Sequence, residues 1–306
     1  MKPKMIIVAG PTAVGKTEYA IDLAKKCDGE IVSLDSVQVY KGLDIGSAKP
    51  SREEQATVKH YMIDEVEPDV NINVKEFKEL AEKHIDDIIN NGKLPILVGG
   101  SGFYINAILY GTNFLEEDER DVLSIQSDLE EIFKKNGKEF LHEMLKQVDP
   151  ESADKIPQNN VRRAIRALTF YKIHGMPISK HNQIEKERVS KYDYTFYVLN
   201  MDRNKLYTRI NVRVDNMIKK GLLVEVKSLI NKGLSKNLNS MNSIGYKELY
   251  DFCSSRDNVS DISKFDEVSK KELKDIIEQI KMHSRNYAKR QLTWFKAQRD
   301  AIWISR

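Results

Sequence analysis

The chain has 306 residues, of which 41% are hydrophobic and 31% are charged, and its net charge at pH 7 is +3. This length can bury a sizeable core and leaves room for one large domain and a smaller one. The composition is that of a soluble globular protein, and no run reaches the roughly 18–20 apolar residues of a transmembrane helix, which excludes an integral membrane protein. The charged residues are unevenly distributed along the chain. Those in 116–154 are mostly acidic, those in 155–188 are mostly basic, and 281–299 contains no acidic residue. Such local basic stretches favour an anionic polymer as partner.

The N-terminal segment combines an apolar run with a glycine-rich loop. Residues 4–10, KMIIVAG, predict a strand that is reached without a cleavable leader, so we expect a cytoplasmic protein. The loop 10–17, GPTAVGKT, has the spacing G-x-x-x-x-G-K-T and precedes a helical pattern. In this context backbone N–H groups wrap a polyphosphate, Lys16 neutralises charge and the Thr17 hydroxyl can ligate Mg²⁺. A chance match in a turn is the alternative, and the flanking strand and helix argue against it.

A second strand is predicted at 30–35, EIVSLD, and it ends in an acid. In open α/β sheets, ligands bind beyond the carboxyl ends of the strands, which places Asp35 near the phosphate loop. There it can accept a proton from an incoming nucleophile, a role that contributes roughly 10²–10⁴-fold to a rate. The alternative is an Asp that caps the next turn. The residues alone leave both roles open.

The strand predicted at 94–100, LPILVGG, ends in glycines where a Walker-B strand would end in an acid. The run GGSG (99–102) indicates close approach of the backbone to a ligand, and Ser101 offers a hydroxyl at the end of the strand. A plain tight turn is the alternative. The two cysteines, Cys27 and Cys253, lack metal-ligand spacing, and we expect both to be buried and inert.

Between 114 and 190 the pattern is helical and polar, without a convincing strand. We expect a helical insertion that leaves and rejoins a sheet domain. Asn160 is expected to cap a helix that begins at Val161. Three arginines near the start of that helix form a basic cluster that is either an RNA contact or a solvated face: Arg162, Arg163 and Arg166.

Further strands are expected at 194–200 and 301–305, with two notable helices between them. The helical pattern that ends near Gly221 has Arg213 at the edge of its apolar stripe. This cation either holds an anion across from the phosphate loop or snorkels and pairs with an acid.

The segment 281–299 reads as a basic C-terminal helix. Its cations fall on one stripe with aromatic rings interleaved: Lys281, Arg285, Lys289, Lys296 and Arg299, with Tyr287, Trp294 and Phe295. Nucleic-acid binding uses such a mixture of phosphate-contacting cations and stacking rings. A solvated helix face is the alternative, and the lack of acids favours RNA.

Strands that alternate with helices imply βαβ units and a parallel sheet. We therefore predict an α/β fold with a P-loop NTPase-like parallel sheet core flanked by helices and an all-helical insertion domain. The core is expected at 1–113 and 191–306, and the insertion at 114–190. From the residues alone, the function is that of a P-loop transferase or kinase acting on nucleic acid.

Over nearly its full length the chain resembles the tRNA dimethylallyltransferases, also called tRNA isopentenyltransferases. Seven segments stand in the family's order and spacing: GPTAVGKT, DSVQVYKGLDIGSAKP, LVGGSGFYINAIL, DPESADKIPQNNVRRAIRAL, RINVRVDNMIKKGLLVEV, SIGYKEL and YAKRQLTWF. The first is generic, whereas the second and the last are highly specific. The chain departs from the family pattern at Tyr61, Ser101, Thr169 and Ser284, and Ser101 keeps the hydroxyl of the usual Thr.

The resemblance implies that the loop holds the diphosphate of dimethylallyl diphosphate, which leaves when N6 of the adenosine 3′ of the anticodon attacks the allylic carbon. Asp35 would take the N6 proton and Ser101 would help to align the diphosphate or the nucleotide. The departing charge would be stabilised by Lys16, Arg213 and a Mg²⁺ on Thr17. The diphosphate-binding residues would be Gly10, Pro11, Thr12, Ala13, Val14, Gly15, Lys16 and Thr17.

The expected partner is tRNA, whose target base must leave its stack. The insertion would grip the anticodon stem-loop, and the enzyme is expected to act as a monomer. The residues expected to bind tRNA are Asp35, Ser36, Val37, Gln38, Ser101, Asn159, Asn160, Val161, Arg162, Arg163, Lys289 and Arg290.

Three other functions stay open. An adenylate isopentenyltransferase would use a free nucleotide, which does not need the insertion and the basic C-terminal helix. A small-molecule kinase would carry out ATP-dependent phosphoryl transfer. An RNA-binding regulator with a nucleotide switch would bind tRNA tightly without forming a product.

Overall fold

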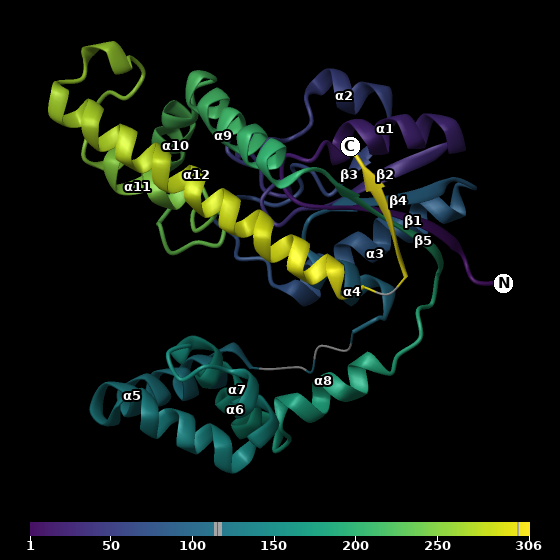
Figure 1. Ribbon diagram of the computed structural model, residues 1–306, viewed down its shortest axis with the longest axis vertical. Coiled ribbons are helices and arrows are strands. Elements are labelled where there is room, and N and C mark those ends of the chain that lie inside the picture. Colours follow the sequence, from purple (N-terminus) through teal and green to yellow (C-terminus); the bar gives the residue numbers. More distant parts are fainter. Residues whose placement is uncertain (113–114, 116–117, 299) are drawn as a thin grey trace. The chain divides into compact units, whose positions relative to one another are not determined.

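Figure 1 shows the computed structural model of the chain, in which residues 1–112, 115, 118–298 and 300–306 are described. The chain separates into two compact units, which we call the core unit (Met1–Leu109 with Lys191–Arg306) and the helical unit (Tyr110–Ser190). Residue 114, where the insertion is predicted to begin, and Arg299 of the predicted basic stripe lie outside the described residues.

The core unit is built on a parallel sheet with the strand order β3-β2-β4-β1-β5-β6. The strands are β1 (Lys4–Ala9), β2 (Gly29–Leu34), β3 (His60–Tyr61), β4 (Leu94–Gly99), β5 (Asp193–Asn200) and β6 (Ala301–Ser305). In the described residues each neighbouring pair is parallel, so the carboxyl ends meet at one edge of the sheet. The predicted parallel α/β core is thereby confirmed, and the two-residue β3 is the strand that the sequence does not predict.

Helices cover both faces of this sheet (Figure 1). Those of the core unit are α1 (Lys16–Cys27), α2 (Arg52–Thr57), α3 (Val74–Asn90), α4 (Gly102–Leu109), α9 (Arg203–Lys219), α10 (Leu222–Asn231), α11 (Tyr246–Ser254) and α12 (Glu267–Lys296), with a 3₁₀ turn at Ile262–Lys264. Side chains alternate along a strand, so Val8 packs towards α1 while its neighbour Ile7 points to the other face. Because both faces are buried, β1 and β4 are nearly continuous apolar runs, whereas β2 also buries Glu30 and Ser33.

The starts of the core-unit helices and the faces that they bury follow from local sequence. Asn73 and Glu76 form a capping box that starts α3, and the helix then buries Phe77 and Ile85 against the sheet. Burial of such a side chain stabilises the fold by about 1.5–3 kcal/mol. Helix α12 begins at Glu267, well before the predicted 281, because Asp266 caps it there.

The cysteines match the prediction only in part. Cys253 is buried, and burial raises the pKa of its thiol to about 12. Cys27 is only half-buried, because it is the last residue of α1 and lies at the margin of the core cluster. The prediction of full burial is therefore wrong for Cys27.

The helical unit consists of α5 (Glu119–Val148), α6 (Pro150–Lys155), α7 (Val161–His174) and α8 (Ile178–Lys186), and no strand occurs in its described residues. Its own core gathers leucines of α5 and α7: Leu129, Leu141, Leu145 and Leu168. Gly137 interrupts α5 with a φ of 85°. Asp149 is buried and joins two helices, because its carboxylate caps α6 at Ser152 and accepts both the N–H and the hydroxyl of Ser179.

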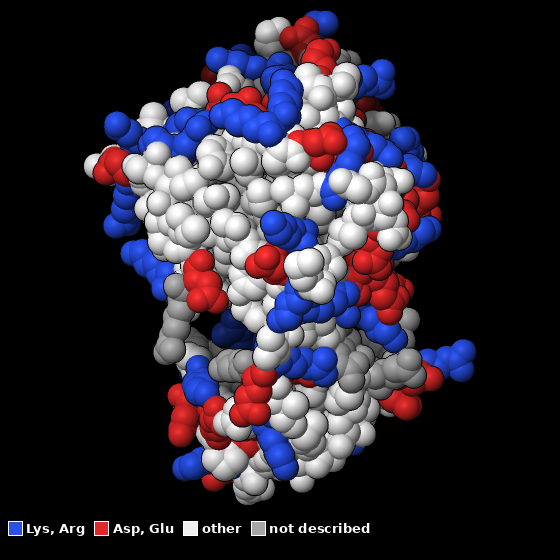
Figure 2. Space-filling model, turned by 90° about the vertical axis from the view of Figure 1, so that its right-hand side faces the viewer, with Lys and Arg blue, Asp and Glu red and all other residues white. Residues whose placement is uncertain are grey.

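Charges of both signs are interspersed over the surface that Figure 2 shows. The net charge of +3 is therefore not gathered into one field on that face. Among the helices of the described residues, none has the length and apolar character needed to cross a bilayer.

Candidate active site

The phosphate loop joins the buried strand β1 to the N-terminus of α1. Gly15 precedes the helix with a φ of 96°, and the first N–H groups of α1 have no partner within the helix. An anion is favoured at this position, because those donors and the helix dipole point towards it. Lys16 Nζ reaches back over the loop and donates to the carbonyl oxygens of Gly10 at 3.0 Å and Pro11 at 2.9 Å.

Lys16 has an unusual electrostatic environment. Burial, and then the positive charge of Arg213, lower the pKa of Lys16 to about 7, while the Asp35 carboxylate opposes both. This environment therefore favours the uncharged amine of Lys16 far more than that of an exposed lysine. A bound polyanion would raise this pKa again, because it favours the ammonium form.

Asp35 lies directly after β2, with its carboxylate in a turn. Its Oδ1 accepts the backbone N–H of Val37 at 2.9 Å and that of Gln38 at 3.3 Å. The capping role that the sequence left open is therefore confirmed for this oxygen. Oδ2 receives no hydrogen bond from the described residues, so it stays available to another donor. Ser36, which lies between Asp35 and Val37 in the sequence, is exposed.

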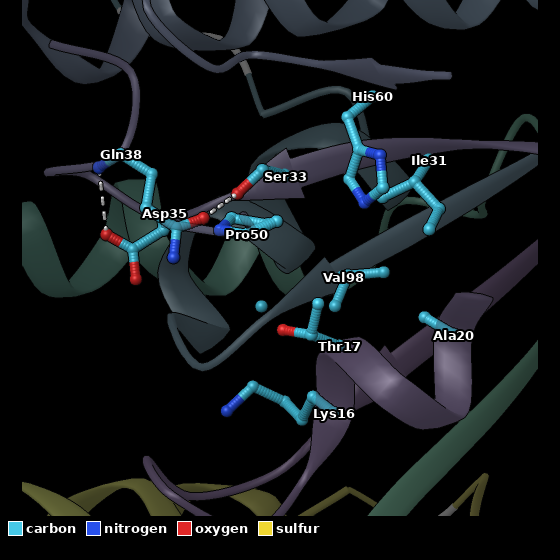
Figure 3. Close-up of a pocket in the computed structure, with 11 residues that line it drawn as sticks. Lys16, Thr17, Ala20, Ile31, Ser33, Asp35, Gln38, Pro50, His60 and Val98 are labelled. Atoms are coloured by element: carbon cyan, nitrogen blue, oxygen red, sulfur yellow. Dashed lines mark hydrogen bonds between the residues drawn. The ribbon is translucent and has the colours of Figure 1, made fainter. Parts of the chain in front are cut away.

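A pocket lies at the carboxyl edge of the sheet, between β2, β4 and the start of α1 (Figure 3). It holds about 390 Å³ of space, part of it open solvent, and is lined by Lys16, Thr17, Ala20, Ile31, Ser33, Asp35, Gln38, Pro50, His60, Val98 and Gly99. Figure 3 shows the polar side chains of Lys16 and Asp35 on one side, and Ala20 and Ile31 on the other. The pocket thus suits a ligand with an anionic head and a short apolar tail.

Gln38 and Arg213 meet at one backbone carbonyl beside the pocket. Gln38 Nε2 donates to the oxygens of Ser47 and Ala48 at 3.3 Å, and its Oε1 accepts the Ser33 hydroxyl at 2.9 Å. Arg213 Nη2 donates to the Ser47 oxygen at 3.4 Å.

Arg213 carries its charge towards the phosphate loop. Burial lowers its pKa and the Asp35 carboxylate opposes this, while Arg213 in turn acts on Lys16. Arg213 forms no ion pair with an acid in the part of the chain that the structure describes. The alternative of an Arg paired with an acid is therefore not found among these residues, and the hydrogen bond of Arg213 goes to the Ser47 carbonyl.

The glycine run after β4 makes room for α12. Gln291 of this helix accepts the N–H of Thr12 through Oε1 and donates through Nε2 to the Gly100 oxygen, both at 2.9 Å. A Cβ on Gly100 would lie 2.0 Å from Gln291 Nε2, and one on Gly102 would lie 2.1 Å from the Trp294 ring. The side chains of α12 approach Gly100 and Gly102, which corrects the prediction of a ligand for these two glycines, whereas Gly99 lines the pocket.

Ser101 stands between these contacts, after β4 and before α4. Its carbonyl accepts the N–H of Ile105 at 3.3 Å in the first turn of the helix. Because β4 lies between β1 and β2, Ser101 lies at the sheet edge between the phosphate loop and Asp35. Within the phosphate loop, the side chains of Pro11 and Val14 are buried and those of Thr12 and Ala13 are half-buried.

Two tyrosines and an amide near the site were not predicted as site residues. Burial together with the Asp35 charge raises the pKa of Tyr104 and Tyr287 to about 12, so both rings stay protonated beside this carboxylate. Tyr104 stacks on Phe77 with 4.1 Å between ring centroids. For Gln291 the sequence holds a signal, because it falls on the same face of α12 as the buried Ala288 and Phe295.

The predicted basic stripe on α12 divides into two parts. Lys281 forms an ion pair with Asp215 at 2.7 Å, and Arg285 donates to Asn211 at 2.7 Å, so both tie α12 to α9. These two cations are structural, which corrects their assignment to a nucleic-acid surface.

The remaining part of the stripe is exposed. Lys289, Arg290 and Lys296 lie at the surface, and the Arg290 guanidinium is 5.7 Å from the centre of the Tyr287 ring. Phe295 is fully buried against Phe196, so it cannot act as a stacking ring for a base.

In the helical unit the predicted cap is confirmed, because Asn160 Oδ1 accepts the N–H of Arg163 at 3.4 Å at the start of α7. Asn159, Arg162 and Arg163 are exposed, as is Arg166, and Val161 is half-buried against the core of the unit.

The parallel sheet, the loop at the N-terminus of α1 and the acid after the neighbouring strand define a P-loop-like α/β protein with its site at the carboxyl edge. The sequence profile of the family described as IPP transferase matches residues 38–298. The chain belongs to this family.

Relatives cover the chain almost completely. A tRNA dimethylallyltransferase of Lachnoclostridium phytofermentans is 44% identical over 306 residues, which is 100% of this chain and 92% of the relative. Among solved structures, the full-length tRNA isopentenylpyrophosphate transferase of Bacillus halodurans has a TM-score of 0.68 and 38% identity, covering 99% of this chain and 90% of that one. A eukaryotic dimethylallyltransferase acting on tRNA has a TM-score of 0.76 and 27% identity, covering 99% and 74%.

Proposed function

We propose that the chain is a tRNA dimethylallyltransferase. It transfers the dimethylallyl group of dimethylallyl diphosphate to N6 of the adenosine 3′ of the anticodon in certain tRNAs, giving N6-isopentenyladenosine and diphosphate. The observation that carries this proposal is the pocket of Figure 3, where a cationic loop, an apolar wall and a carboxylate meet. Membership of the family and the names of the relatives support it.

The diphosphate head binds at the phosphate loop. The free N–H groups at the start of α1 and the Lys16 ammonium face the anion, and Arg213 approaches from α9. The apolar tail lies against the wall formed by Ala20 and Ile31. These groups are fixed before the reaction, so they can stabilise charge that grows on the leaving diphosphate.

The transfer forms one bond and breaks another. The N6 lone pair attacks the allylic carbon, the bond from that carbon to the diphosphate oxygen breaks, and its electron pair leaves with the diphosphate. The N6 proton goes to Asp35 Oδ2, the oxygen left open by the turn. Ser101 aligns the diphosphate or the nucleotide from the end of β4.

Mg²⁺ fits the polar end of the pocket. The Thr17 hydroxyl lines it, while no group of three or more His, Cys, Asp or Glu side chains in the described residues is placed to hold a metal. Mg²⁺ commonly uses few protein ligands and completes its shell with water and substrate phosphates, so Thr17 and the diphosphate would suffice. Bound there, it supplies further neutralisation of the leaving charge.

The tRNA contacts two surfaces, one in the core unit and one in the helical unit. In the core unit, Lys289 and Arg290 of α12 are exposed, and Ser36, Val37 and Gln38 form the turn beside Asp35. In the helical unit, the exposed residues around the start of α7 offer a basic surface to the phosphates of an anticodon stem-loop. Because all of these residues belong to one chain, a monomer suffices for the reaction.

The experiment combines the protein with an unmodified anticodon stem-loop, Mg²⁺ and dimethylallyl diphosphate, followed by nuclease digestion and mass spectrometry. We expect prenylated adenosine with the RNA and none with AMP. A stem-loop with guanosine in place of the target adenosine is the matched control. Prenylated AMP would indicate an adenylate isopentenyltransferase, and consumption of ATP without a prenylated base would indicate a kinase. Tight RNA binding without any product would indicate a regulator.

A further inference from the structure

The carboxylate of Glu225 on α10 accepts several hydrogen bonds from the backbone of the loop that follows Tyr40. Glu225 Oε2 accepts the backbone N–H of Asp44 at 3.1 Å and that of Ile45 at 2.7 Å. Its Oε1 accepts the N–H of Gly46 at 3.1 Å and the Tyr246 hydroxyl at 2.6 Å. Four donors thus converge on one charged acceptor, and hydrogen bonds to charged groups are about twice as strong as neutral ones.

The next two residues of the same loop face the active site. The carbonyl oxygen of Ser47 accepts both Gln38 Nε2 and Arg213 Nη2, and that of Ala48 accepts Gln38 Nε2. Ser47 is itself buried. A segment of five residues therefore has its first three N–H groups held by α10 and its last two carbonyls aimed at side chains beside the pocket.

The grip leaves little freedom of movement. Tyr246 is fully buried, and a Cβ on Gly46 would lie 2.4 Å from its ring. Burial and the neighbouring Glu225 charge raise the pKa of Tyr246, so its hydroxyl remains a donor. Rotation of the loop would break contacts at the ring and at the carboxylate together.

We propose that Glu225 is a positioning residue for the transfer reaction, holding the 44–48 loop so that Ser47 and Ala48 fix the Gln38 amide and the Arg213 guanidinium. This role rests on the proposed function. Gln38 belongs to the turn offered to the acceptor, and Arg213 faces the departing diphosphate. Glu225 itself touches neither substrate and acts through the loop.

The test uses Glu225→Gln, in which one carboxylate oxygen becomes an NH₂ group that faces N–H donors instead of accepting from them. We expect kcat to fall at least tenfold. The KM for dimethylallyl diphosphate should change less than threefold, because the phosphate loop is untouched. Tyr246→Phe removes one donor of four and should lower kcat two- to fivefold, and this variant carries the test if Glu225→Gln does not fold.

Val226→Ala is the matched control, because Val226 is fully buried on the same helix, and its truncation destabilises the protein without removing any of the four hydrogen bonds to Glu225. At a temperature below every melting transition, we expect Val226→Ala to keep wild-type kcat. Hydrogen exchange of the 42–49 peptide supplies a readout without catalysis, and it should accelerate in Glu225→Gln and not in Val226→Ala.

The outcomes separate the two proposals. The positioning role would be overturned by unchanged hydrogen exchange at 44–46 in folded Glu225→Gln, or by equal kcat losses in Glu225→Gln and Val226→Ala. In either case the proposed function stands as long as the wild type forms product. A wild-type chain that forms no prenylated adenosine overturns the proposed function, and the positioning role falls with it.

Discussion

The exchange Asp35→Asn separates the two roles of this carboxylate. Asn keeps an oxygen for the N–H groups of Val37 and Gln38, so the turn after β2 is retained. The loss is the difference between hydrogen bonds to a charged and to a neutral acceptor, about 1–2 kcal/mol of unfolding free energy. What disappears is the second oxygen, which is the proposed proton acceptor.

The catalytic effect should be far larger than the structural one. Loss of a positioned general base costs roughly 10²–10⁴-fold in rate, which is about 2.7–5.4 kcal/mol in the barrier. Asp35→Ala is the matched variant, since it removes both oxygens. We expect it to show a similar rate loss and, in addition, a lower unfolding free energy.

Single-turnover rates with saturating tRNA and donor measure the chemical step, and urea unfolding measures the turn. The assay is run at pH 6 and at pH 8, because Asp35 holds up the pKa of Lys16 and its loss weakens donor binding more at the higher pH. The result that refutes the reasoning is an Asp35→Asn rate within threefold of wild type at pH 6. Asp35 would then act only in the turn.

Four further predictions concern the phosphate loop and α12. Because the pKa of free Lys16 is about 7, donor binding should take up a proton at pH 8 and weaken as pH rises from 7 to 9; calorimetry that shows no proton uptake contradicts this. The same lowered pKa means that Lys16 binds fewer protons in the folded than in the unfolded chain between pH 7 and about 10.5, so its own contribution to stability should rise with pH. Because the raised pKa values of Cys253, Tyr104 and Tyr287 act in the opposite direction at higher pH, the test is the difference in unfolding free energy between wild type and Lys16→Met, which should grow from pH 7 to pH 9. Replacing Lys289 and Arg290 by Ala should weaken tRNA binding and reduce the slope of log K against log salt by roughly 1.5, whereas Lys281→Ala should lower stability and leave the slope unchanged. Gln291→Met leaves the Thr12 N–H and the Gly100 carbonyl without partners, so the unfolding free energy measured in urea should fall by about 2–4 kcal/mol and the donor KM should rise. An unchanged unfolding midpoint would contradict a stabilising role for these two hydrogen bonds.

The sheet and the loop could be predicted because their signals are local. Strands β1, β2 and β4 are buried on both faces and rich in apolar residues, and their ends differ from the prediction by one residue. Strand β3 has two residues and owes its place to pairing with β2, which no local pattern reveals. The start of α12 was missed because its first half is rich in charges and buries only Leu273 and Ile280.

The site could be predicted as far as its residues act within their own segment. Asp35 directly follows a buried strand, and its place on the same edge of the sheet as the phosphate loop could be predicted because the carboxyl ends of parallel strands meet at one edge. Glu225 and Gln291 are different, because their loop partners lie 179 or more residues away in sequence. Lys281 likewise finds Asp215 only after two helices pack, so a row of cations could not be divided into bound and free members beforehand.

The amide bridge of Gln291 also has a consequence for the order in which the protein is made. It joins α12 to residues 279 and 191 positions earlier, at Thr12 and Gly100. With elongation at about 5–20 residues per second, the phosphate loop leaves the ribosome tens of seconds before its brace. Throughout that interval the nascent chain carries a complete loop sequence without the support that shapes it. An unfinished chain that lacks α12 therefore leaves the Thr12 N–H and the Gly100 carbonyl without their Gln291 partner until synthesis is almost complete.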